Sequence, residues 1–210
     1  MTATTDPQLQ SALTALALPG IMVGHRLISA GDEYALMPRE SSAFANHVLT
    51  ARRASGAVRL VAREFLAQLG RANYELLKAP SGAPVWPADV TGSLAHDFRV
   101  AIAAVGRRQD VRVLGIDIEP AEPLPSDRLE LVTTPNERRR LDLDPFGGRR
   151  YFVAKEAVYK AVFQLDQTFL EHHDIEVDFS NCKAVTRTGR SVDLKVCIAS
   201  HLVVLAVDRP

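Results

Sequence analysis

The chain has 210 residues, 47% of them hydrophobic and 24% charged, and a formal net charge of zero. This composition is ordinary for a soluble globular protein with one large domain or two small ones, and the balanced charge gives no reason to expect binding to nucleic acid or to an anionic membrane. Two cysteines, Cys182 and Cys197, exclude a multi-disulfide framework and a cysteine-rich zinc site, so we expect free, buried thiols in a reducing cytoplasm.

The N-terminal half opens without the basic segment of a signal peptide, and its first apolar run is too short to cross a bilayer. Residues 21–37 alternate weakly and predict a strand or two. Residues 40–69 have helical spacing, with Ser55-Gly56 as a possible break between two helices and Gly70 placed as a C-cap. The prolines of residues 78–92 then forbid regular helix and predict an ordered loop.

Two strands are expected next, over residues 98–106 and 111–120, joined as a hairpin through residues 107–110. The segment "TTPNERRR" predicts a helix start, with Thr134 as N-cap, Pro135 at the first position and Glu137 three residues after the cap. Residues 144–150 read as a break before the helix "FVAKEAVYKAVF". Three strand-like runs close the chain, over residues 174–179, 191–199 and 201–208.

Two apolar runs resemble each other across the chain, "VAIAAV" at residues 100–105 and "LVVLAV" at 202–207. Each lies some forty residues beyond a helix rich in Ala, Val and Leu. We therefore expect an α+β fold made of two related halves, residues 1–106 and 107–210, with the boundary near residues 107–110.

The segment "GIDIE" carries the first candidate chemistry. In a strand, Asp117 and Glu119 face one side while Ile116 and Ile118 face the other, toward the core. Two adjacent carboxylates repel each other, and a hard divalent cation such as Mg²⁺ removes that conflict. An exposed acidic edge is the alternative.

The helix "FVAKEAVYKA" carries the second set. Glu156 and Lys160 are four residues apart and share a face, so they form either a solvated ion pair or part of a site. In a site, Glu156 would add a third metal oxygen or act as a general base, and Lys160 would hold a phosphate oxygen or protonate a leaving group. Lys155 points elsewhere, toward solvent or an outer phosphate.

The third set lies further upstream. His96 comes at the end of "GSLAH", where loop residues contact ligands, although a lone histidine also serves structural roles. Arg52, Arg59 and Arg63 follow one helical stripe that suits a phosphate or, alternatively, a solvated face. The three sets together suit an enzyme that transfers a phosphate group, because they supply metal ligands, a base, a lysine and phosphate-binding arginines.

The order "WP…GSLAHD", "GIDIE" and "FVAKEAVYKA" resembles the 4′-phosphopantetheinyl transferases, in particular the single-chain, two-lobed branch that includes enterobactin synthase component D. The resemblance spans roughly residues 40–180. It implies two similar α+β halves related by a pseudo-twofold axis, with the active site in the cleft between them. It also implies that coenzyme A donates its phosphopantetheine arm to a serine of an apo acyl- or peptidyl-carrier protein, leaving 3′,5′-ADP.

The resemblance also implies roles for individual residues. Asp117, Glu119 and Glu156 match the Mg²⁺ ligands. Glu156 also matches the candidate base, and Lys160 matches the lysine on the pyrophosphate. Four more match the coenzyme A contacts: His96 on its phosphates, Arg52 and Arg59 on the 3′-phosphate, and Lys78 beside the adenine nucleotide. The chain departs from the family at Ala83 and Ala95, and the segment "RRASGAV" leaves the choice between Arg52 and Arg53 open.

Two other functions remain open at this point, a metal-dependent nucleotide phosphohydrolase and a non-catalytic homologue that binds carriers. Five arginines near the catalytic helix would steer an acidic carrier or remain solvated charges: Arg138, Arg139, Arg140, Arg149 and Arg150. We expect a cytoplasmic monomer, and the sequence leaves the choice of carrier among siderophore, polyketide and fatty acid synthesis open.

Overall fold

The computed structural model of the chain describes residues 4–141 and 144–210. Its strands form two antiparallel sheets with the orders β1-β3-β2 and β4-β8-β7-β6-β5. The strands are β1 (Ile21–Leu27), β2 (Val90–His96), β3 (Val100–Arg107), β4 (Val113–Pro120), β5 (Ile175–Asp178), β6 (Lys183–Thr186), β7 (Ser191–Ile198) and β8 (His201–Asp208). The helices are α1 (Pro7–Leu13), η1 (Thr14–Leu16), η2 (Asp32–Ala35), α2 (Pro38–Ala43), α3 (Leu49–Gln68), α4 (Ser126–Val132), α5 (Pro135–Arg139), α6 (Gly147–Asp166) and η3 (His172–Asp174).

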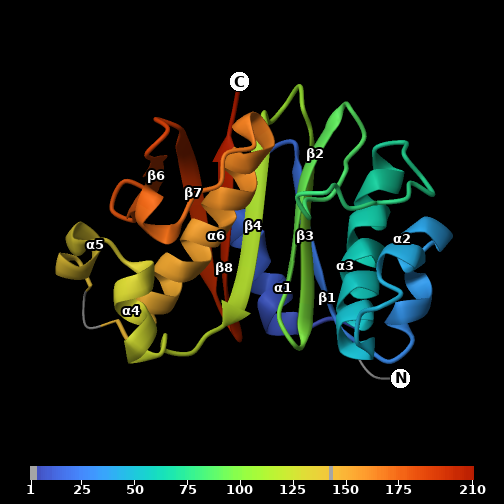
Figure 1. The fold of residues 1–210 in the computed structure, drawn as a ribbon, viewed down its shortest axis with the longest axis horizontal. Coiled ribbons are helices and arrows are strands. Elements are labelled where there is room, and N and C mark those ends of the chain that lie inside the picture. The colour runs from blue at the N-terminus through green and yellow to red at the C-terminus, as the bar shows by residue number, and fades with distance from the viewer. Residues whose placement is uncertain (1–3, 142–143) are drawn as a thin grey trace.

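Each sheet is covered by one long helix, α3 on the first sheet and α6 on the second (Figure 1). Both halves contain a strand, a long helix and an antiparallel pair whose second strand is central in a three-stranded unit, although in the second half β5 and β6 precede the pair and extend the sheet. Hence β1-β3-β2 corresponds to β4-β8-β7. The two similar apolar runs of the sequence are β3 and β8, the two strands in these central positions. The predicted α+β fold with two sheet-bearing halves is thus confirmed, while the division into domains at residues 106 and 107 stays a prediction.

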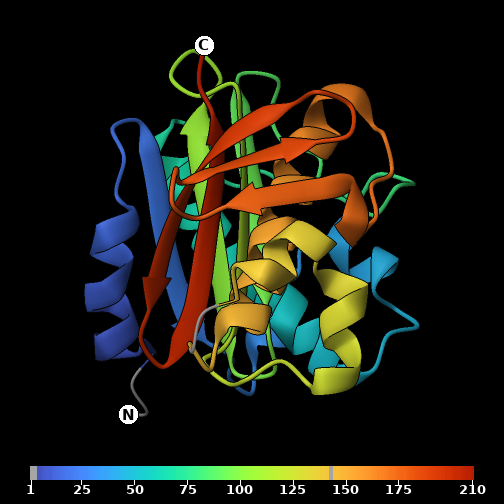
Figure 2. The ribbon, with the colours of Figure 1, turned by 90° about the vertical axis from the view of Figure 1, so that its left-hand side faces the viewer.

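A shared apolar core lies on the sheet face opposite the two long helices. It contains Ile102 of β3, Ile116 and Ile118 of β4, and Val203 of β8, each at most 1% exposed. The helix α1 and the following η1 close this core, and α1 contacts β1 of one sheet and β7 of the other (Figure 2). The isoleucines of "GIDIE" therefore anchor β4 as the alternation predicts, which turns the carboxylates of the same segment the other way.

The two sheets meet where β2 lies beside β4. The two strands run in the same direction, because Gly92 and Leu114 are bridged by one side chain and Ser93 and Ile116 by another. They belong to separate sheets, so side chains replace the usual ladder of main-chain hydrogen bonds between them. We call this junction the seam.

The expected hairpin between residues 98–106 and 111–120 is wrong. The strand β3 pairs with β1 and β2, whereas β4 pairs with β8. A strand in the middle of a sheet needs a hydrogen-bonded neighbour on each side, and β1 and β2 already fill both places beside β3. The short connection after Arg107 instead carries the chain from one sheet to the other.

The predicted helix break at Ser55-Gly56 is also wrong, because α3 continues through both residues. Gly56 is there for close packing: a Cβ at this position would clash with the main-chain carbonyl of Asp32. The break lies earlier, between α2 and α3. Residues 21–37 hold a single strand followed by η2. The strands β2 and β6 were not expected, and β2 begins at Val90, inside the segment predicted to be a loop.

Other local predictions hold. Gly70 has the left-handed φ of +79° that favours glycine after a helix. The Thr134 side chain caps α5 by accepting from the Glu137 main chain, and the Glu137 carboxylate accepts from the Thr134 main chain. The helix containing "KEAVYK" starts at Gly147, so the expected break over residues 144–150 extends too far.

Both cysteines are free, but only Cys197 is buried, so the expectation of two buried thiols is wrong for Cys182, which is exposed. Over residues 4–141 and 144–210, none of the helices combines the length and apolar character needed to span a bilayer.

Candidate active site

The site is built where α6 crosses β4. Gly115 permits this crossing, because a Cβ there would collide with the main-chain carbonyl of Ala157. Lys160 on α6 thereby reaches Asp117 on β4, with 2.6 Å between its Nζ and the Asp117 Oδ1. Glu156 turns instead to His172, whose Nε2 lies 3.1 Å from the Glu156 Oε1. Both residues thus bind partners on other elements, which is not the solvated pair along the helix surface that was the alternative.

The carboxylates of β4 lie in an unfavourable electrostatic setting. Burial raises the pKa of Asp117, which is 7% exposed, and the nearby Lys160 offsets this only in part. Burial and the charge of Asp117 together raise the pKa of Glu119. Arg149 works against that rise with its Nη1 2.9 Å from the Glu119 Oε2. Asp117 is therefore buried and Glu119 partly buried, so the pair is not an exposed acidic edge.

The carboxylates suit a hard divalent cation by their chemistry, since Mg²⁺ takes oxygen ligands and would relieve the repulsion from Asp117 that, after burial, raises the pKa of Glu119. These carboxylates do not form a compact metal centre in the structure. In the part of the chain that the structure describes, no three His, Cys, Asp or Glu side chains are grouped closely enough to hold a metal ion. Asp117, Glu119 and Glu156 each face a basic side chain, so magnesium and its ligand set remain predictions.

Glu156 differs from the other two carboxylates in that its pKa is lowered rather than raised. The hydrogen bond from His172 lowers the pKa of Glu156, and the positive charge of Lys160 lowers it further against the opposing effect of burial. His172 begins η3, and its ring also packs against Phe152. An ionised carboxylate held by a hydrogen bond at its side is suited to accept a proton.

A pocket of about 360 Å³ opens beside this centre, at the seam. Four elements line it: α3, the proline-rich loop, β2 and α6. Its basic lining residues are Arg59, Lys78, His96 and Lys160. The structure thus brings together four of the predicted phosphate and coenzyme A contacts, from both halves of the chain. Arg52 is not among the residues that line it.

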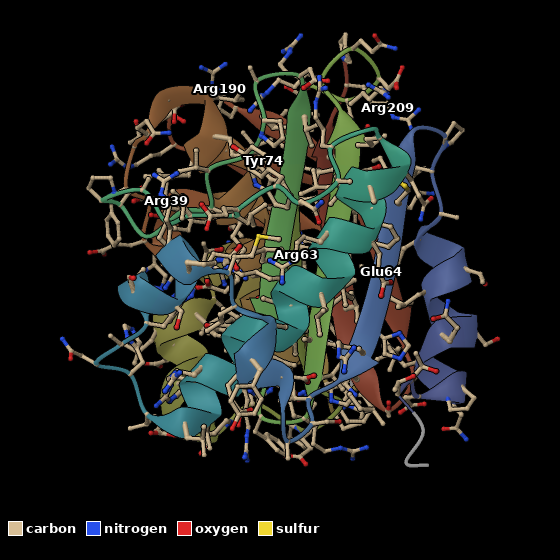
Figure 3. All side chains as sticks on the ribbon, turned by 90° about the vertical axis from the view of Figure 1, so that its right-hand side faces the viewer. Arg39, Arg63, Glu64, Tyr74, Arg190 and Arg209 are labelled. Carbon is tan, nitrogen blue, oxygen red and sulfur yellow. The ribbon has the colours of Figure 1, made fainter. Side chains whose placement is uncertain are left out.

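The arginines of α3 near the pocket pair with the buried carboxylate of Glu40. Arg59, 2% exposed, donates to the carbonyls of Leu76 at 3.0 Å and Ser55 at 3.1 Å, and its Nε lies 3.6 Å from the Glu40 Oε1. Arg63, labelled on α3 in Figure 3, places its Nη1 3.0 Å from Glu40. The solvated arginine stripe that was the alternative is therefore wrong for these two residues, while the phosphate role of Arg59 stays a prediction.

Lys78 and His96 lie nearer the opening. The Lys78 ammonium sits 4.8 Å from the centre of the Phe44 ring, and burial together with Arg59 lowers the pKa of Lys78. His96 is solvent-accessible at the end of β2, yet crowding by protein atoms lowers the pKa of its ring, and Lys160 and Lys78 add to that effect. A neutral ring can donate a hydrogen bond to an anion without a charge of its own.

Lys155 is not where the sequence suggested. The side chain is fully buried, with its Nζ 2.6 Å from the Glu137 Oε2 and 2.8 Å from the His172 carbonyl. Glu137 in turn accepts from the main chain of Val177 at 2.7 Å. The expectation of a solvent-facing or phosphate-binding lysine is wrong, because this ammonium joins α6 to the capping residue of α5.

Family comparisons agree with this geometry. The model of the 4′-phosphopantetheinyl transferase N-terminal domain matches residues 39–106, and that of the 4′-phosphopantetheinyl transferase superfamily matches residues 113–206. The chain is 38% identical over 160 residues to the 4′-phosphopantetheinyl transferase PptT of Mycobacterium tuberculosis, a match that covers 74% of this chain and 70% of that protein. The chain belongs to the 4′-phosphopantetheinyl transferase superfamily.

Other relatives of this phosphopantetheinyl transferase include Npt of Nocardia iowensis, 34% identical over 77% of this chain and 74% of the relative. Enterobactin synthase component D of Escherichia coli is 35% identical over 99 residues, which are 44% of this chain and 46% of that protein. The resemblance stated from the motifs is confirmed, and the protein is a transferase.

Sequence reasoning missed three residues of the transferase's site. His172 stands in "EHHD", and nothing in that run sets one histidine apart from its neighbour. Arg149 was expected to steer the carrier or to remain a solvated charge, but it lies in the first turn of α6 and binds Glu119. Gln164 lies one turn beyond Lys160 and lines the pocket; its spacing of four residues was the available signal.

Proposed function

We propose that this enzyme transfers the phosphopantetheine arm of coenzyme A to a serine hydroxyl of an apo acyl- or peptidyl-carrier protein and releases 3′,5′-ADP. The observation that carries the proposal is the pocket at the seam, where basic side chains of both halves surround a space that ends at the Lys160–Asp117 pair. A pyrophosphate needs such a cluster of cations, and Glu156 lies one helical turn before Lys160 on α6.

In the proposed reaction, the serine oxygen attacks the phosphorus that bears the pantetheine arm, and the bond from that phosphorus to the oxygen of 3′,5′-ADP breaks. Glu156 takes the serine proton, directly or through one water, and its lowered pKa leaves the carboxylate in the proton-accepting form. Lys160 stabilises the negative charge that develops on the leaving oxygen, while Arg59, Lys78 and His96 hold the nucleotide.

Asp117, Glu119 and Glu156 would hold Mg²⁺. When bound, the ion supplies charge neutralisation on the phosphates. We expect transfer to stop when a chelator removes the ion and to return on addition of Mg²⁺ or Mn²⁺, and titration with each ion separates the two.

The deciding experiment incubates the enzyme with coenzyme A, Mg²⁺ and an apo-carrier protein and follows the carrier by mass spectrometry. The carrier should gain the mass of one phosphopantetheine group. Replacing the base, as in Glu156→Ala, should lower kcat by about 10²- to 10⁴-fold, and Asp117→Ala should abolish transfer with the fold intact. Asp127→Ala, which removes an exposed carboxylate of α4, is the matched control. A Glu156→Ala enzyme near the wild-type rate would refute the assignment.

The same assay tests the two alternatives. A phosphohydrolase would release phosphate or nucleotide without any carrier present, and a non-catalytic homologue would bind carriers without changing their mass. Running the assay across carriers of siderophore, polyketide and fatty acid synthesis identifies the acceptor.

Carrier recognition follows from charge. We infer that the exposed arginines at the end of α5, Arg139 and Arg140, steer an acidic carrier toward the site. Arg138, Arg149 and Arg150 are only partly exposed, and they bind the Thr133 carbonyl, Glu119 and Asp144. Arg140 is exposed although its Nη1 lies 3.8 Å from the Asp178 Oδ2.

The charge reversals Arg139→Glu and Arg140→Glu should raise the KM for the carrier and leave the affinity for coenzyme A unchanged. Arg108→Glu, a reversal in the turn after β3, is the control. An unaltered KM for the carrier would refute steering by this pair. We also propose that the enzyme acts in the cytoplasm and that it is a monomer. Light scattering of the purified protein checks the oligomeric state.

A further inference from the structure

The seam between β2 and β4 is joined by side chains, chiefly by one amide. The Gln164 Nε2 on α6 lies 2.7 Å from the Leu114 carbonyl of β4 and 3.3 Å from the Gly92 carbonyl of β2. The Thr91 hydroxyl donates to the Gln164 Oε1 at 2.8 Å. A single side chain therefore contacts both edge strands of the seam.

The orientation of this amide is fixed by its surroundings. Carbonyl oxygens only accept hydrogen bonds, and Nε2 faces three of them, since the Lys160 carbonyl lies 3.1 Å away as well as those of Leu114 and Gly92. Oε1 faces the Thr91 hydroxyl, which can donate. Turning the amide over would set its oxygen against carbonyl oxygens and would leave the fully buried Thr91 without its acceptor.

The strands that the amide ties are the ones that carry the two sides of the pocket. Five residues beyond Thr91, β2 ends at His96; three residues beyond Leu114, β4 presents Asp117. Lys160, one helical turn before Gln164, binds that aspartate at 2.6 Å. The separation of β2 from β4 at the amide thus sets the separation of His96 from the Lys160–Asp117 pair.

We propose that Gln164 is a positioning residue, which holds the β2 and β4 sides of the seam at the spacing that lets His96 and Lys160 engage one pyrophosphate together. The inference rests on the proposed function and adds a specific requirement to it. Thr91 is part of the device, because its hydroxyl fixes the amide from the side away from the ligand, and it is not among the residues that line the pocket.

Thr91 allows a test that does not touch the pocket. Thr91→Val keeps the side-chain shape and removes the hydroxyl, whereas Thr91→Ser keeps the hydroxyl. Displacements of about 1 Å in such a site can cost about 10²-fold, so the loss of one orienting bond should raise the KM and the calorimetric Kd for coenzyme A about tenfold in Thr91→Val. Thr91→Ser should stay within about twofold of wild type, and the KM for the carrier should be unchanged in both.

A merely structural role gives a different pattern. Partial misfolding lowers the fraction of active enzyme, and therefore the apparent kcat, without changing the KM for coenzyme A. A Thr91→Val enzyme with a wild-type KM for coenzyme A would overturn the inference.

The nearly isosteric change Gln164→Met completes a double-mutant cycle with Thr91→Val. It also provides a second test if Thr91→Val folds poorly. If the two residues act as one unit, the double variant should be no weaker in coenzyme A binding than Gln164→Met alone. Additive losses would overturn the inference and leave the transferase assignment standing. A wild-type enzyme that does not bind coenzyme A at all would overturn the proposed function instead.

Discussion

Replacing Lys155 by methionine should cost the protein much of its stability. The change removes the ammonium that lies 2.6 Å from the Glu137 carboxylate, where both side chains are 0% exposed. Breaking a buried ion pair by deleting one partner costs about 3–5 kcal/mol, because the other charge is left without compensation. Whole domains have a free energy of unfolding of only about 5–15 kcal/mol.

The assay is thermal unfolding followed by calorimetry. For a chain of this size, each kcal/mol lowers Tm by roughly 2–4 °C, so Lys155→Met should unfold roughly 6–20 °C below the wild type. Adding Glu137→Gln removes the buried charge and keeps an acceptor oxygen for one of the two main-chain N–H groups that bond to Glu137, those of Val177 and Thr134, so the double variant should recover part of the loss. Lys195→Met, at an exposed position of β7, should change stability by no more than about 0.5 kcal/mol.

The opposite outcome would support the phosphate role that the sequence suggested for Lys155. In that case Lys155→Met would unfold within about 1 kcal/mol of the wild type and would bind coenzyme A more weakly. That pattern would refute the argument from burial.

Three further predictions follow from burial and close packing. Cys182 should react with a thiol reagent at pH 8 in the native protein while Cys197 should react only after unfolding, because burial raises the pKa of Cys197 to about 11; two fast thiols would contradict this. Burial alone would raise the pKa of Asp97, but its hydrogen bonds, above all the one from His201, lower the pKa below 3.8. The ionised carboxylate therefore stabilises the fold above pH 3.8, and this stabilisation is lost as the pH falls further. Asp97→Asn should therefore destabilise the protein at pH 7 with a difference that shrinks below about pH 4 in urea titrations, and a constant difference would refute the linkage. Gly115→Ala should destabilise by about 1–3 kcal/mol through overpacking and lower transfer by displacing α6. Gly147→Ala, at the start of the same helix, is the control, because its Cβ would meet only the end of the Leu141 side chain, at 3.1 Å, and no main chain.

Much of the site followed from local pattern. The alternation in "GIDIE" placed the isoleucines in the core and the carboxylates opposite them, and the spacing of Glu156 and Lys160 placed both on one face of a helix. These rules depend only on the period of a strand or a helix, so they transfer directly from sequence to structure.

The errors arose where distant parts of the chain decide the outcome. Lys155 has the same local surroundings in the sequence as any surface lysine, and its burial comes with contacts to Glu137 of α5 and to the His172 carbonyl of η3, both distant along the chain. The strand β3 pairs with β1 and β2, which both precede it in the sequence, so the short connection to the following strand β4 suggested the wrong partner. Gly56 looked like a helix breaker, although its role is to let the main chain near Asp32 approach the helix.

The indole of Trp86 packs over Gly92 in the space that a Cβ would occupy, and the ring lines the pocket. It is the only tryptophan in the sequence. Intrinsic emission excited at the red edge of protein absorbance therefore comes from a single chromophore at the pocket wall. Occupancy of the pocket can be followed in real time on the unlabelled enzyme, by stopped-flow quenching, before any group transfer takes place.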